Sequence, residues 1–181
     1  MKKSTTLQLA IIALMAALMC IAGPLSIPLP VTLVPISLTN LVIYIAAYVL
    51  GAKKTTASFI IYLLIGLAGL PVFSGFGSGF GKLLGPTGGY LVGFILTAFI
   101  TGFFVEKFSD KIYMQVVGMV LGVTAAYLFG TVWFSYQQTM SFGASLAMCV
   151  YPFLIGDAIK IAIAAIIGPM IRKRLIRANL I

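Results

Sequence analysis

Long apolar runs, separated by short polar or glycine- and proline-rich connections, make up nearly the whole chain. A helix needs about 20 predominantly apolar residues to cross the hydrocarbon of a bilayer. The pattern therefore predicts an all-α membrane protein with six transmembrane helices, folded as a single domain over residues 1–181. The spans are expected near residues 7–23, 36–50, 55–70, 90–105, 112–134 and 145–171.

The first apolar run follows Lys2 and Lys3 and fits two interpretations. A basic start followed by an apolar stretch is typical of a secretory signal peptide. Because the rest of the chain is equally apolar, we interpret the run instead as the first span. Lys2 and Lys3 would then hold its start at the cytoplasmic side of the membrane.

Composition confirms the class and sets the orientation. The chain is 61% hydrophobic and 8% charged, with a mean hydropathy of +1.16, whereas soluble domains carry roughly a quarter charged residues. The net charge of +9 comes from basic residues at the ends of apolar runs, which argues against a nucleic-acid surface. With the N and C termini cytoplasmic, ten basic residues lie inside and Lys82 alone outside, as expected for a multi-pass protein of the cell membrane.

Few residues are available for catalysis. The chain has no histidine, and its two cysteines, Cys20 and Cys149, lie in apolar spans. The sequence therefore predicts no metal site, no cofactor and no enzyme activity, since a lipid-modifying membrane enzyme usually needs several clustered carboxylates or histidines. Residues 79–82 (Gly-Phe-Gly-Lys) lack the spacing of a phosphate-binding loop.

Asp157 and Lys160 lie inside the last apolar run, and a single helix over that run would place them near the membrane midplane. Either charge costs about 2.5 to 3.5 kcal/mol at a helix centre. Their i, i+3 spacing puts both side chains on one face. They form either a structural ion pair or a site for a small polar ligand, and we favour the site because intramembrane charges usually serve a function.

Three connections are predicted on the outer face. Pro24 to Pro35 should not be helical, because each proline removes a backbone donor. Residues 75–89 contain seven glycines, which suits either a lid or a flexible loop. With residues 135–143 they would cover a cavity above Asp157 and Lys160.

Trp133 is either an interfacial anchor or a platform for the ligand.

Three sequence blocks resemble the BioY family over nearly the whole chain. They are Gly69-Leu70-Pro71-Val72-Phe73-Ser74-Gly75, Leu84-Gly85-Pro86-Thr87-Gly88-Gly89-Tyr90 with Gly93-Phe94, and Pro152-Phe153-Leu154 with Gly156-Asp157 and Lys160. The family often has glutamine where this chain has Thr39, with Asn40 adjacent, and proline where it has Ile155.

The resemblance implies a six-helix S component of an energy-coupling factor (ECF) transporter, which binds biotin from outside. Its implied partners are a transmembrane coupling (T) subunit and two cytoplasmic ATPases. Asp157 would accept a ureido N–H of biotin, and Lys160 would hold either the ureido oxygen or the carboxylate. The other implied ligand contacts are Thr87, Tyr90, Gly88, Gly89, Asn40, and Phe76 or Tyr151 against the ring. Ala13 and Ala17 resemble the motif that docks the coupling subunit.

A second function class is a self-sufficient, proton-coupled carrier for biotin or another small carboxylate, with Asp157 as the proton site. Carriers of this kind are often built from inverted repeats. The Gly-Asp-x-x-Lys block has no counterpart in the first three predicted spans. This argues against a carrier within one chain, although two copies could supply the missing half.

Overall fold

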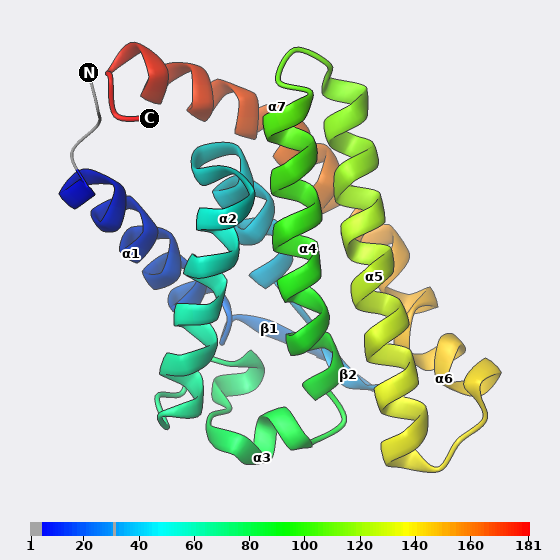
Figure 1. The fold of residues 1–181 in the computed structure, drawn as a ribbon. Helices are drawn as coiled ribbons and strands as arrows, with labels where there is room; N and C mark the ends of the chain where they lie inside the picture. Colours follow the sequence, from blue (N-terminus) through cyan, green and yellow to red (C-terminus); the bar gives the residue numbers. More distant parts are fainter. Residues whose placement is uncertain (1–4, 31) are drawn as a thin grey trace.

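The computed structural model describes residues 5–30 and 32–181, so the predicted topology signals Lys2 and Lys3 lie outside the described residues. The chain is mostly helical, with one short pair of strands (Figure 1). By length and hydropathy, five apolar helical segments of the described chain are long enough to cross a membrane. The elements are α1 (Thr5–Ala22), β1 (Ser26–Leu29), β2 (Thr32–Ser37), α2 (Thr39–Leu67), α3 (Gly79–Leu84), α4 (Gly88–Lys107), α5 (Ile112–Gln138), α6 (Phe142–Cys149) and α7 (Leu154–Arg177).

Helix α2 is two antiparallel helices joined at Gly51, where φ is 72° and ψ is −171°. In a straight helix Thr39 and Tyr62 would lie roughly 35 Å apart. Both instead line one cavity, because the chain doubles back at Gly51 (Figure 1). Residues 39–50 and 52–67 therefore match the second and third predicted spans, and the prediction of a six-helix bundle is confirmed.

Glycines set the distances between the central helices. A Cβ atom on Gly93 of α4 would lie 2.7 Å from the Ala126 Cα of α5. One on Gly102 of α4 would lie 2.4 Å from the Ala52 Cα of α2. Both distances are shorter than real Cβ contacts, so these glycines let α4 pack directly against the backbones of α2 and α5.

The proline-rich segment is non-helical, as predicted, but it is also ordered as a β-hairpin. Strands β1 and β2 are antiparallel, with Ile27 opposite Ile36. Pairing gives the backbone groups partners, which an irregular segment next to lipid would lack. The sequence analysis missed these strands because the prolines exclude a helix without indicating a partner.

The last predicted span is wrong in its outline, since residues 145–171 do not form one helix. Helix α6 ends at Cys149, a short 3₁₀ turn follows at Tyr151–Phe153, and α7 begins at Leu154. Pro152 lies in this break, where its ring prevents a continuous helix. Asp157 is thus in the first turn of α7 rather than in the middle of a helix, and the partial positive charge at a helix N-terminus stabilises its carboxylate.

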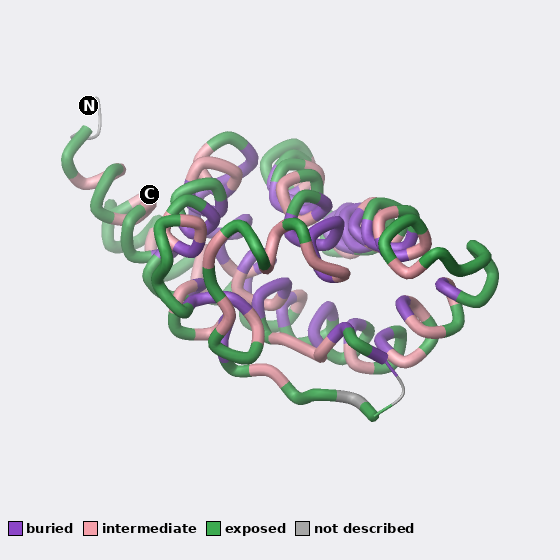
Figure 2. Tube along the Cα trace, turned by 90° about the horizontal axis from the view of Figure 1, so that it is seen from below, coloured by how far each residue is buried: buried purple, intermediate pink, exposed green. Residues whose placement is uncertain are grey.

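The two ends of the bundle differ in charge. The turn at Gly51, the α4–α5 connection and the end of α7 lie at one end, while the hairpin, α3 and α6 lie at the other (Figure 1). The first end carries most of the basic residues of the described chain, and Lys82 of α3 lies at the second. Exposed residues lie mainly on the outside of the helices (Figure 2), and many of them are large and apolar, as expected for surfaces facing lipid.

Candidate functional site

A cavity opens at the hairpin end of the bundle, where α2, α4, α5, α7 and β2 converge. It measures about 620 Å³, counting the space at its mouth. Both halves of α2 contribute, through Asn40 and Tyr62, so the site exists only because the chain reverses at Gly51.

Asp157 and Lys160 form the charged end of this cavity. Each residue is 7% exposed, and the Lys160 Nζ lies 2.9 Å from the Asp157 Oδ1. Lys160 also donates to the Ser37 carbonyl oxygen at 2.7 Å, which ties α7 to the end of β2. An ammonium has three N–H donors, so one stays available to a ligand.

Asn40 and Tyr127 fix the carboxylate of Asp157 from two other helices. The Asn40 Nδ2 donates to Oδ1 at 2.8 Å, and the Tyr127 hydroxyl donates to Oδ2 at 2.5 Å. Oδ1 therefore accepts from two donors and Oδ2 from one. Since each carboxylate oxygen can accept about two hydrogen bonds, Oδ2 keeps one site free for a ligand N–H.

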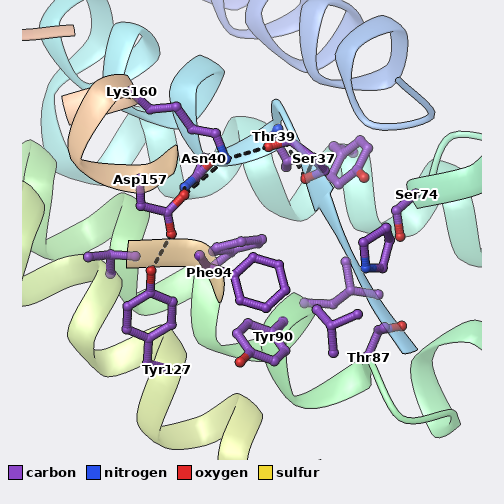
Figure 3. Close-up of a pocket in the computed structure, with 16 residues that line it drawn as sticks. Ser37, Thr39, Asn40, Ser74, Thr87, Tyr90, Phe94, Tyr127, Asp157 and Lys160 are labelled. Atoms are coloured by element: carbon purple, nitrogen blue, oxygen red, sulfur yellow. Dashed lines mark hydrogen bonds and ion pairs between the residues drawn. The ribbon is translucent and has the colours of Figure 1, made fainter. Parts of the chain in front are cut away.

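With distance from Asp157 and Lys160, the cavity lining changes from aromatic rings to side chains that carry hydroxyl groups. In Figure 3 the rings of Phe94 and Tyr90 lie between the charged end and the side chains of Thr87 and Ser74. The Tyr90 hydroxyl is not free, since it donates to the carbonyl of Cys149. The cavity thus offers a charged end, an aromatic middle and a second polar end.

Comparison with known proteins identifies the family. The sequence model of the BioY family matches residues 1–177. The chain belongs to the BioY family.

Two biotin transporters support this membership, because each matches this chain over most of its length. A biotin transporter, BioY2, of Lactococcus lactis is 30% identical over 179 residues, which is 99% of this chain and 97% of that protein. A probable biotin transporter BioY of Pyrococcus horikoshii is 31% identical over 161 residues, 89% of this chain and 93% of its own.

A solved structure has the same fold. The crystal structure of the S-component for biotin from an ECF-type ABC transporter superposes with a TM-score of 0.88 at 32% identity, covering 96% of this chain and 94% of the other. At 32% identity over nearly the whole chain, this match shows that the protein has the fold of that S-component.

Three of the predicted ligand contacts lie in the cavity together with the charged pair. Thr87, Tyr90 and Asn40 join Asp157 and Lys160 as lining residues. Gly88 and Gly89 do not line it. A Cβ atom on Gly89 would lie 2.3 Å from the Trp133 Cβ, and the Trp133 Nε1 donates to the Gly85 carbonyl at 2.9 Å. Gly89 and Trp133 therefore pack α4 against α5, whereas a Cβ atom on Gly88 would lie 1.6 Å from the Leu83 carbonyl oxygen of α3.

Phe76 and Tyr151 also lie away from the cavity lining, and they are 67% and 64% exposed. Their contact with a ligand stays a prediction, and it would require movement of the segments that carry them. Ala13 and Ala17 are exposed on α1, whereas Ala16 and Met19 of the same helix face the bundle. The small-residue pair is thus open to a partner.

The sequence analysis missed five lining residues that bear on chemistry: Ser37, Tyr62, Ser74, Phe94 and Tyr127. Tyr127 contacts Asp157 across 30 residues of sequence. A tyrosine in the middle of an apolar span was the available signal, because a buried phenol needs a hydrogen-bond partner. Phe94 stood within a motif of the family resemblance, but nothing in the sequence pointed its ring into the site.

Proposed function

We propose that this member of the BioY family binds biotin in the hairpin-end cavity and acts as the membrane-embedded S component of an ECF transporter. One observation carries the proposal: the buried Asp157–Lys160 pair provides an acceptor and a donor side by side at the charged end of an aromatic-lined cavity. The family membership and the likeness to an S-component for biotin support the same ligand.

The ureido group of biotin is the part best matched to the charged end. In a cyclic urea, an N–H donor and the C=O acceptor lie next to each other. The free acceptor site on the Asp157 Oδ2 and the third donor of Lys160 present the complementary pair. Of the two ends of biotin that Lys160 could hold, the geometry therefore favours the ureido oxygen.

The remaining parts of biotin fit the other zones of the cavity. The sulfur ring would pack against Phe94 and Tyr90, and the carboxylate tail would reach the hydroxyls of Thr87 and Ser74. The hairpin end would then face outward and the basic end the cytoplasm, as the distribution of lysine and arginine predicts.

If transport is driven by ATP, the energy must come from other subunits, because the sequence has no phosphate-binding loop. We assign this role to a transmembrane coupling subunit and two cytoplasmic ATPases. The exposed Ala13 and Ala17, one helical turn apart on α1, are the proposed contact with the coupling subunit.

Ala13→Trp and Ala17→Trp are expected to abolish biotin uptake in cells that contain the coupling subunits while leaving biotin affinity unchanged. A bulky ring on this face would keep a partner helix from close approach but lies far from the cavity. Uptake of labelled biotin and calorimetry on the purified variants measure the two effects. Loss of binding in either variant would contradict the docking role.

Tyr127→Phe is expected to weaken biotin binding roughly tenfold, because hydrogen bonds to charged groups contribute about 1.5 to 3 kcal/mol and this one orients the Asp157 carboxylate. Tyr113→Phe, which removes an exposed hydroxyl from the same helix, is the matched control. Equal affinities for both variants and the wild type would exclude a role for Tyr127 in the site.

Titration calorimetry with biotin on the purified, detergent-solubilised chain tests the function directly. Two analogues separate the ends of the ligand: biotin methyl ester lacks the carboxylate charge, and diaminobiotin lacks the ureido carbonyl. Diaminobiotin should lose far more affinity than the ester if the ureido group occupies the charged end. No binding of biotin to well-folded protein would overturn the assignment.

A further inference from the structure

A second cavity lies at the basic end of the bundle, between α1, the Gly51 turn of α2, the end of α4 and the last residues of α7. It measures about 860 Å³ with the space open to solvent. Its lining is part polar and part apolar. The residues that matter here are Gln8, Ile11, Lys54, Glu106, Arg172 and Ile176.

Two cations of this cavity are available to an anion. The Arg172 Nη1 donates to the Tyr48 carbonyl at 2.8 Å, which anchors the guanidinium and leaves its other N–H groups free. The Lys54 side chain makes no hydrogen bond or ion pair with any residue that the structure describes. Glu106 also lines the cavity, yet within the described chain no ion pair joins it to Lys54 or Arg172.

The surroundings strengthen the positive charge. Lys173, Arg174 and Arg177 are exposed at the same end of the bundle. The predicted orientation places this end at the cytoplasmic surface of the membrane, where anionic lipids gather. Basic pockets between membrane helices on that side are suited to phospholipid head groups.

We propose that this cavity binds the phosphate group of an anionic phospholipid of the inner leaflet, held by Lys54 and Arg172. The apolar part of the lining favours a lipid over a soluble phosphate. Ile11 and Ile176 can contact the apolar part of a lipid, but they make no favourable contact with a free anion. The inference does not depend on biotin binding.

Native mass spectrometry of the purified chain tests this with dioleoylphosphatidylglycerol and dioleoylphosphatidylcholine at matched concentrations. The wild type should retain the phosphatidylglycerol preferentially. Lys54→Gln should reduce its retention roughly fivefold, as removal of one basic residue near a membrane surface predicts. Lys53→Gln, the same charge change on the exposed neighbouring residue, should leave retention unchanged.

Three results would overturn the proposal. Equal retention of the two lipids would mean that the cavity does not recognise charge. An equal loss in Lys53→Gln and Lys54→Gln would indicate attraction by the net charge of this end rather than by a site. Displacement of the lipid by inorganic phosphate at millimolar concentration would assign the cavity to a soluble anion. An unchanged thermal unfolding temperature in Lys54→Gln shows that the variant is folded.

Discussion

Asp157→Asn should weaken biotin binding by two orders of magnitude or more. The substitution keeps the shape of the side chain but removes its charge, so a ureido N–H loses its charged acceptor. A hydrogen bond to a charged group contributes about 1.5 to 3 kcal/mol, and the buried Lys160 is left without its counter-charge at the same time. Calorimetric titration of the purified variant measures the loss.

Asp110→Asn is the matched control, because it removes an exposed carboxylate from the α4–α5 connection and should leave the affinity unchanged. Thermal unfolding of both variants in the same detergent separates a binding defect from a folding defect. If Asp157→Asn binds within a few-fold of the wild type, the pair with Lys160 is a structural ion pair and the ligand lies elsewhere.

The spans could be predicted from the sequence because the bilayer imposes one requirement on every segment: an apolar helix of sufficient length. The reversal at Gly51 could also be predicted, because Gly51 and the two lysines that follow it, Lys53 and Lys54, separate two apolar runs. Lysine and arginine at the ends of runs are costly to bury, so the grouping of Lys53, Lys107 and Arg172 at one end of the bundle followed as well.

The start of α7 could not be placed from hydropathy, because apolar residues continue through α6, the turn at Tyr151–Phe153 and the helix that follows. Pro152 was a local signal of a break, but the apolar run was the stronger pattern. The β-hairpin was missed for a related reason. Pairing of Ile27 with Ile36 depends on a turn and a register that four prolines in twelve residues obscure.

In the candidate site, the residues that sequence could identify are those that are costly in a membrane. Asp157, Lys160 and Asn40 have few reasons to be buried other than contact with one another or with a ligand. Tyr127 and Phe94 are ordinary in an apolar helix, so only the packing of α4 and α5 shows which way they point. Gly88 and Gly89 were predicted as ligand contacts but lie at contacts between helices. A glycine near a site and a glycine at a helix contact look the same in sequence.

Gly51→Val should destabilise the protein by at least about 1 to 3 kcal/mol. The free energy of unfolding of a native protein is typically only about 5 to 15 kcal/mol. The dihedral angles of Gly51 lie in a region that is essentially restricted to glycine, and a β-branched side chain raises the energetic cost of adopting them. The two halves of α2 could then no longer reverse without strain, and the cavity that both halves line would distort. Thermal unfolding and the yield of folded protein measure the effect.

Two comparisons separate backbone strain from crowding at this turn. A Cβ atom on Gly51 would lie 1.9 Å from the Glu106 Oε1, but Glu106 is exposed and its carboxylate can move aside. Adding Glu106→Ala to Gly51→Val should therefore restore little stability. Gly143→Val, where nothing lies within 4 Å of the added Cβ, should unfold like the wild type. Full rescue by Glu106→Ala would show instead that the glycine is needed for space, and that the turn itself tolerates a side chain.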